Sequence, residues 1–177
     1  MQPRYFPKNR HRFRPLIISL LILAASLAAL KLASTRVILQ VTGSLPKGIY
    51  AIHAPTRIKT GQLVVFDVPR QVRDLVLARG WIPAHLRYHL LKPVVAVPGD
   101  SVVVCEKGLF INGDYFGAVK KYDSRGLALP KLDKRYVLKA GEYFTACRHD
   151  DSFDGRYFGP IIQKSILAVA APLLVFN

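Results

Sequence analysis

A serine and a lysine that lie far apart in the chain stand in local sequences that could support acyl-transfer chemistry. Ser44 lies within residues 42–46, TGSLP, and Lys92 is followed by residues 93–100, PVVAVPGD. A lysine can act as general base for a serine nucleophile only if burial removes its charge near neutral pH. The apolar residues around Lys92 indicate either an amine that reaches solvent at a strand end or a buried, deprotonated amine, and the local sequence alone favours the first.

A third polar cluster lies late in the chain, in residues 149–159, HDDSFDGRYFG. Its carboxylates lack the spacing and the final glutamate of a calcium loop, so we predict no metal site. Asp154 and Arg156 are expected to form an ion pair that fixes a loop, which leaves Ser152 free to hydrogen-bond a neighbouring amine. His149, beside two aspartates, is the candidate base for an alternative Ser-His-Asp arrangement.

The N-terminal segment combines a basic flank with an apolar stretch. Residues 1–15 contain five Lys or Arg and no acid, and residues 16–30 carry no charge. A helix over the uncharged stretch covers only about 23 Å of a hydrocarbon core of about 30 Å, so we predict a longer transmembrane anchor, residues 16–38. The basic flank places the N-terminus in the cytoplasm and residues 39–177 in the periplasm. A signal peptide cleaved near residues 26–28 is the alternative, but apolar character continues beyond that point.

The chain is strongly basic, with 26 Lys and Arg against 11 Asp and Glu and a net charge of +15. A basic domain near a bilayer is attracted to anionic lipid headgroups. No helix-turn-helix, zinc-finger or RNA-binding motif accompanies the charge, so we predict no specific nucleic-acid partner.

Cys105 and Cys147 could pair in an oxidising compartment, and two free thiols fit the spacing equally well. No cofactor is predicted.

Residues 40–177 have the pattern of a mainly β domain. Short β-branched and aromatic runs separated by Gly, Pro and Asp predict strands at residues 63–66, 94–97, 101–105, 143–147 and 166–170. Asn112 and Gly113 between apolar runs predict a tight hairpin over residues 109–116. The apolar run 166–176 is too short to span a membrane, and we expect it to close the core rather than to contact lipid.

The hydrophobic period changes from that of a strand to that of a helix after residue 69. Val72 and Val76 recur at helical spacing, and Gly80 is a helix stop. Pro83 can open a second short helix. We therefore expect a small helical insertion in the β domain, at about residues 69–91.

Taken in order, the three polar segments resemble those of the signal peptidase I superfamily and, within it, those of the TraF-type peptidases of conjugative transfer systems. These enzymes share a membrane anchor, a serine box, a lysine box with Val-Val-x-x-Pro-Gly-Asp, and a late Asp-x-Ser-x-Asp-x-Arg-Tyr-x-Gly box. The matching stretches here are residues 42–46, 92–100 and 150–159, and the resemblance covers residues 40–165. It implies a signal-peptidase-like β domain with a Ser-Lys dyad, preceded by one transmembrane helix.

Two details of the sequence are similar to the TraF branch rather than to general signal peptidases. Residues 44–50 have the form Ser-Leu-Pro-x-Gly-x-Tyr, and Pro93 stands where general signal peptidases usually carry arginine. The helical insertion also fits the TraF branch.

Carried over residue by residue, the resemblance implies that Ser44 is the nucleophile and Lys92 its general base. Thr42 would donate its hydroxyl to the oxyanion, beside the backbone N–H of Ser44. Ser152 would orient the lysine amine, and the predicted ion pair of the late box would support the site.

The resemblance therefore implies a membrane-anchored serine endopeptidase of the bacterial inner membrane that processes exported precursors through an acyl-enzyme. A conjugative prepilin is the expected substrate, bound as an extended strand. A general type I signal peptidase is the alternative within the same class. A catalytically silent factor for pilus or secretion assembly, built on the same fold, is the alternative outside it.

Overall fold

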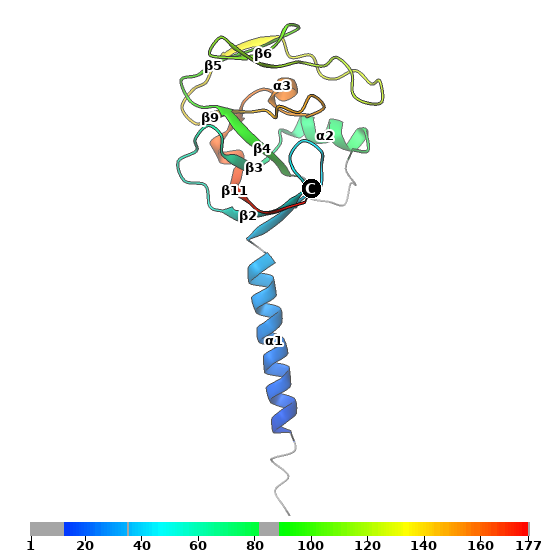
Figure 1. The fold of residues 1–177 in the computed structure, drawn as a ribbon, viewed down its shortest axis with the longest axis vertical. Coiled ribbons are helices and arrows are strands. Elements are labelled where there is room, and N and C mark those ends of the chain that lie inside the picture. The colour runs from blue at the N-terminus through cyan, green and yellow to red at the C-terminus, as the bar shows by residue number, and fades with distance from the viewer. Residues whose placement is uncertain (1–12, 35, 82–88, 177) are drawn as a thin grey trace, which may run out of the picture. The chain divides into compact units, whose positions relative to one another are not determined.

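The computed structural model describes residues 13–34, 36–81 and 89–176. The chain divides into two units, Met1–Val37 and Ile38–Asn177. The first contains one long helix, and the second contains two β-sheets with short helices (Figure 1).

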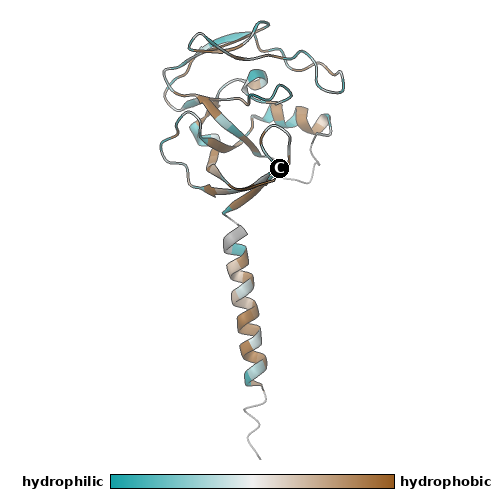
Figure 2. Ribbon diagram, in the orientation of Figure 1, coloured by the Kyte–Doolittle hydropathy of each residue, from teal (hydrophilic) through white to brown (hydrophobic). Residues whose placement is uncertain are grey.

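Helix α1 (Arg14–Ser34) accounts for most of the first unit. Its 21 residues correspond to about 31 Å of helix, close to the thickness of a bilayer core. The window Arg14–Lys31 has a mean hydropathy of 1.8, and hydrophobic residues run along much of the helix in Figure 2. By length and composition this helix can cross a membrane, which fits membrane anchoring. It ends before residue 38, the predicted limit of the anchor, because the β-branched residues Val37 and Ile38 already belong to the first strand.

Within the described residues, the second unit contains a seven-stranded sheet in the order β1-β2-β11-β3-β4-β9-β10. Its strands are β1 (Val37–Gln40), β2 (Gly48–His53), β11 (Ile166–Val175), β3 (Leu63–Asp67), β4 (His89–Ala96), β9 (Glu142–Thr145) and β10 (Ile161–Ile162). The mainly β fold that the sequence predicts is confirmed.

A second sheet has the order β7-β6-β5-β8. Its strands are β5 (Ser101–Cys105), β6 (Gly108–Ile111), β7 (Asp114–Gly117) and β8 (Lys134–Val137). It packs on the C-terminal half of β4 and on β9 through a buried apolar cluster that includes Ala96, Val104 and Phe144. In Figure 1, β5 and β6 lie on one side of β9, and β2 and β11 lie on the other.

The hairpin between β6 and β7 confirms the prediction from the Asn-Gly pair. Asn112 and Gly113 both have positive φ, 51° and 93°, which a two-residue primed turn requires. Ile111 pairs with Asp114 across the turn.

Helix α2 (Arg70–Ala78) occupies the region of the predicted insertion and buries Val72 and Val76. Gly80, with φ of 62°, follows its end. Strand β4 already begins at His89, so the last residues of the expected insertion are strand. The physical reason is burial and pairing, because Leu90 and Leu91 are buried opposite Phe66 and Val65 of β3. The short helix expected at Pro83 lies outside the described residues.

Strand β11 contains most of the apolar C-terminal run and lies between β2 and β3. Its first half closes the core as expected, with Val169 and Ala170 buried. Pairing with β3 ends at Ala170, and the residues beyond it are exposed. The run is therefore a core strand over its first half only.

Candidate active site

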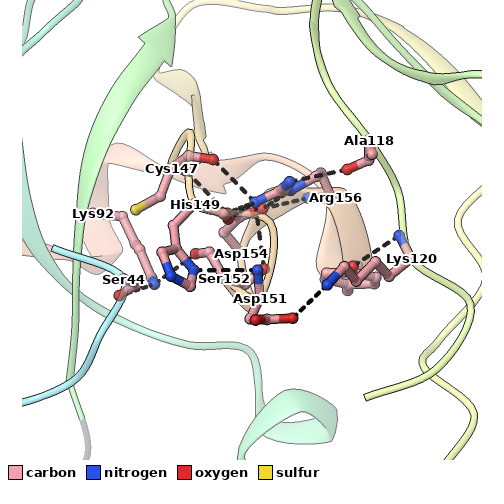
Figure 3. Close-up of polar contacts among 11 residues, drawn as sticks. Ser44, Lys92, Ala118, Lys120, Cys147, His149, Asp151, Ser152, Asp154 and Arg156 are labelled. Atoms are coloured by element: carbon pink, nitrogen blue, oxygen red, sulfur yellow. Dashed lines mark hydrogen bonds and ion pairs between the residues drawn. The ribbon is translucent and has the colours of Figure 1, made fainter. Parts of the chain in front are cut away.

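Strand β4 carries Lys92 into the interior of the second unit. Lys92 pairs with Val64 of β3 and is only 4% exposed. Its Nζ lies 2.7 Å from Ser44 Oγ and 2.8 Å from Ser152 Oγ (Figure 3). The structure therefore brings together one residue from each of the three polar segments of the sequence.

The environment of Lys92 disfavours a charged amine. Burial lowers the pKa of Lys92 below the ordinary lysine value of 10.5. Cys147 and Asp154 oppose that shift, and the positive charge of Arg156 adds to it. The local sequence favours an amine that reaches solvent, and this prediction is wrong. Two hydroxyls from distant segments of the chain, those of Ser44 and Ser152, hold the Lys92 amine in the interior of the domain.

Ser44 lies in the turn between β1 and β2, half-buried, where a substrate can reach it. Thr42 Oγ1 is 3.4 Å from Ser44 Oγ. Gln40, the last residue of β1, donates from Nε2 to Thr42 Oγ1 at 2.6 Å and to the Thr42 carbonyl at 3.1 Å. Gln40 is 8% exposed, and no local pattern in the sequence marks it as part of the site.

The predicted ion pair between Asp154 and Arg156 is present, and both side chains are fully buried. Arg156 Nε donates to Asp154 Oδ1 at 2.9 Å and Nη2 donates to Oδ2 at 2.8 Å. The guanidinium also donates to the carbonyls of Ala118, Cys147 and His149 (Figure 3). This network joins the loop that carries Ser152 to the chain that follows β7.

The backbone of this loop is packed tightly at Gly155, the first residue of helix α3 (Gly155–Phe158). A Cβ at Gly155 would lie 2.7 Å from the Thr145 carbonyl and 2.8 Å from the Phe144 ring. Only glycine allows α3 to approach β9 this closely. Because β9 pairs with β4, this contact sets the position of the loop relative to Lys92.

His149, the candidate base of the alternative arrangement, lines the same cavity as Ser44. Its Nδ1 accepts the backbone N–H of Asp151 at 3.2 Å. In the described part of the chain no hydrogen bond joins His149 to Ser44, whose hydroxyl instead contacts Lys92 and Thr42. The geometry therefore favours lysine over histidine as the partner of Ser44.

Cys147 is buried beside the site, and burial raises the pKa of its thiol. Cys105 lies in β5, and both cysteines are free thiols in the structure.

Within residues 13–34, 36–81 and 89–176, no group of three or more His, Cys, Asp or Glu side chains is arranged to hold a metal ion.

A cavity of about 270 Å³ opens over Ser44 and Lys92. Its lining comes from three elements: the end of β1 with the serine turn, the start of β4, and the loop before α3. The residues are Gln40, Thr42, Gly43, Ser44, His89, Leu90, Leu91, Lys92, His149, Asp151, Ser152 and Phe153.

The start of β4 has an open backbone edge beside this cavity. Residues from His89 to Pro93 pair with β3 on one side. On the other side β9 pairs only with Val94 and Ala96 among the described strands. Among the described strands, none therefore pairs with His89 to Leu91 on that side.

Comparison with known proteins identifies the family to which this chain belongs. The family model described as signal peptidase, peptidase S26 matches residues 10–174. The chain therefore belongs to the signal peptidase S26 family, a family of serine peptidases.

Relatives of this chain include proteins named for plasmid transfer and conjugal transfer. The chain is 33% identical over 165 residues to a plasmid transfer protein TraF of Escherichia coli, covering 86% of this chain and 87% of the relative. It is 29% identical over 148 residues to a conjugal transfer protein TraF of Agrobacterium fabrum, covering 77% and 81%. The resemblance to TraF-type proteins is thus confirmed. A solved signal peptidase I from Enterococcus faecalis aligns over 69% of this chain and 98% of its own, with 19% identity and a TM-score of 0.36.

Proposed function

We propose that this chain is a membrane-anchored serine endopeptidase in which Ser44 is the nucleophile and Lys92 is the general base. One observation supports this proposal above all: a buried lysine amine lies 2.7 Å from a half-buried serine hydroxyl. No carboxylate hydrogen-bonds that amine among the described residues, so burial can keep it neutral.

In the acylation step, the lone pair of Lys92 Nζ takes the proton of Ser44 as Oγ attacks the scissile carbonyl carbon. The negative charge that develops on the carbonyl oxygen is stabilised by the Ser44 backbone N–H and by the Thr42 hydroxyl. The protonated amine then gives its proton to the leaving amine nitrogen as the peptide bond breaks. An ester between Ser44 and the substrate remains.

In the second step, neutral Lys92 takes a proton from the acceptor that attacks the ester. Water as acceptor releases a linear carboxylate, and an amine as acceptor forms a new peptide bond with no net loss of water. The regenerated Ser44 hydroxyl receives the proton from Lys92. The residues of the site serve either acceptor.

Ser152 and the ion pair behind it have supporting roles. Ser152 Oγ accepts a hydrogen bond from Lys92 Nζ, which would aim the single lone pair of the neutral amine at Ser44. Asp154 and Arg156 hold the loop of Ser152 through buried or half-buried hydrogen bonds to its backbone and to each other.

The substrate would bind as an extended strand along the open edge of β4. Main-chain hydrogen bonds to His89–Leu91 would supply affinity, and the walls made by Leu91 and Phe153 would favour small apolar side chains next to the cleaved bond. An exported, membrane-proximal precursor such as a conjugative prepilin fits this mode. The names of the TraF relatives, which are plasmid and conjugal transfer proteins, support a substrate from conjugation.

The location that fits this function is the bacterial inner membrane. The basic residues before α1 would keep the N-terminus in the cytoplasm and place the β domain in the periplasm. Anionic lipids would attract the basic surface of the domain. Ser44 follows the end of α1 by ten residues in the sequence.

Mass spectrometry of a candidate prepilin co-expressed with the chain tests the proposal. Wild type should convert the precursor to a shorter product, and Ser44→Ala or Lys92→Ala should leave it intact at equal expression and membrane insertion. Ser165→Ala and Lys164→Ala, which change the same residue types outside the site, should process normally. A product lighter than the linear fragment by one water would identify the substrate's own N-terminal amine as the acceptor and the product as cyclic. Full processing by both Ser44→Ala and Lys92→Ala would contradict the peptidase and favour a silent assembly factor.

A further inference from the structure

Gln40 is a buried polar residue of the site to which the mechanism above gives no role. Its amide nitrogen contacts Thr42 twice, at the side-chain oxygen and at the backbone carbonyl. We propose that Gln40 is a positioning residue that fixes Thr42 as a hydrogen-bond donor to the oxyanion. This inference rests on the proposed function, because it deepens the role of Thr42 in the same reaction.

The backbone carbonyl of Thr42 determines which end of the Gln40 amide faces Thr42. A carbonyl oxygen can only accept, so the group 3.1 Å from it must be the NH₂ end of the amide. The opposite orientation would bring two acceptors together. The same nitrogen therefore also donates its second hydrogen to Thr42 Oγ1 at 2.6 Å.

A hydroxyl that accepts from an NH₂ group must direct its own proton elsewhere. Thr42 has one hydroxyl proton, and Gln40 offers it no acceptor. The neighbouring Ser44 Oγ is 3.4 Å away, a long distance for a hydroxyl hydrogen bond. The proton of Thr42 is therefore available to an oxyanion that forms beside Ser44.

The same contact keeps Thr42 from competing for the proton of Ser44. With a lone pair of Oγ1 engaged by Gln40, Thr42 is a poorer acceptor for the Ser44 hydroxyl, and that proton is directed to Lys92 at 2.7 Å. Hydrogen bonds polarise one another in a low-dielectric environment. Because Gln40 is buried, its hydrogen bond to Thr42 should therefore strengthen the one that Thr42 donates to the oxyanion.

Replacement of Gln40 by glutamate tests the direction of the hydrogen bond. Gln40→Glu keeps the size of the side chain but offers Thr42 only acceptors, so the hydroxyl proton would turn toward residue 40. The charge would also repel the oxyanion. We expect kcat to fall about a hundredfold, as for loss of one oxyanion donor, with KM changed less than about threefold. Gln163→Glu, the same change at an exposed position, should leave both constants unchanged.

The rate is measured with full-length protein in detergent micelles, on a synthetic peptide that carries the cleavage site mapped by mass spectrometry. Gln40→Met, which removes both donor and acceptor, should lose about tenfold because Thr42 is no longer held. Thermal unfolding of each variant shows whether the fold is kept. If Gln40→Glu does not fold, the kcat of Gln40→Met decides, and an unchanged value would overturn the proposal.

A double-mutant cycle separates positioning from a merely structural role. In a Thr42→Val background the hydroxyl is absent, so the uncharged variant Gln40→Met should cause little further loss of kcat. An equal loss in both backgrounds would show that Gln40 acts by another route and would overturn the proposal. A full rate for Gln40→Glu with loss of activity in Ser44→Ala would overturn the positioning role and leave the peptidase intact. Activity retained in Ser44→Ala would overturn both.

Discussion

Two buried basic side chains lie in this site, and their environments act on their charged forms in opposite ways. Arg156 is enclosed by the carboxylate of Asp154 and by backbone carbonyls, whereas the amine of Lys92 contacts two neutral hydroxyls (Figure 3). Burial by itself would lower the pKa of both groups. Hydrogen bonds and charge from Asp154 reverse the effect for Arg156 and raise its pKa. Among the described residues no carboxylate hydrogen-bonds Lys92, and its pKa is lowered by burial although the charge of Asp154 opposes that shift.

In the proposed mechanism, this difference allows one small region to hold a structural charge and a neutral base together. The Asp154 carboxylate pairs with Arg156, whose guanidinium cannot lose its proton under ordinary conditions. Arg156 in turn holds the loop of Ser152 and adds a positive field that disfavours a second cation at Lys92. The two basic side chains are therefore expected to have separate roles. Variants can exchange or remove the hydrogen bonds and charges that distinguish their environments.

The largest effect on the rate is expected when Lys92 is replaced by arginine, the residue type of its buried neighbour Arg156. Lys92→Arg keeps a basic side chain but remains protonated at any usable pH, so it cannot take the Ser44 proton. We expect the processing rate to fall about a thousandfold or more. Single-turnover cleavage of the mapped peptide measures this, with Lys164→Arg as the matched control. Activity within tenfold of wild type would contradict a neutral base at residue 92.

Removal of the arginine from its pair should instead reduce stability. Arg156→Met leaves Asp154 buried and charged without its partner, and we expect a loss of about 3–5 kcal/mol in the free energy of unfolding. Adding Asp154→Asn to the same variant should recover part of that loss, since the buried charge is then gone. Urea unfolding of the three proteins measures both values, and an Arg156→Met variant as stable as wild type would show that the pair is not structural.

A carboxylate placed beside Lys92 should make it resemble Arg156. Ser152→Asp would favour the protonated amine and raise the pKa of Lys92, so the rising limb of the pH–rate profile should move to higher pH. At neutral pH the rate should fall about tenfold or more. Ser152→Ala serves as the comparison, because it removes the same hydroxyl without adding charge. A profile that does not move between the two variants would contradict the electrostatic account.

The smallest effect is expected from removing the buried amine altogether. Because the folded state binds the Lys92 proton less tightly than the unfolded chain does, folding is opposed at neutral pH. Lys92→Met should therefore be more stable than wild type by about 1 kcal/mol near neutrality. Between the lowered pKa of Lys92 and 10.5 the unfolded state binds more protons, so wild-type stability rises with pH and the advantage of Lys92→Met should shrink. A difference that stays constant over this range would contradict a lowered pKa.

Much of this site could be predicted because its parts lie in short, ordered segments. The late box identifies the pair of Asp154 and Arg156 within a few residues, and Asn112-Gly113 identifies a hairpin through a local rule of turn geometry. The contacts between Ser44, Lys92 and Ser152 follow from the resemblance of whole segments rather than from any one of them.

The features that were missed depend on parts of the chain that are distant in sequence. Burial of Lys92 requires Ser152, sixty positions later, and β9 packed beside β4. The role of Gln40 depends on where β1 ends and on how the next turn folds back, which no residue pattern indicates. The start of β4 at His89 is set by pairing with β3, and this outweighs the helical spacing that precedes it.

Titration of the Lys92 amine is the most direct test of the central claim. The full-length protein, labelled with ¹⁵N-lysine and held in detergent micelles, can be followed by NMR from neutral to alkaline pH, with Lys92→Met identifying the signal. The account predicts one lysine that loses its proton below the ordinary value of 10.5 and is missing from the spectrum of the variant. A Lys92 signal that titrates with the exposed lysines would contradict a neutral base, and with it the proposed Ser44–Lys92 mechanism.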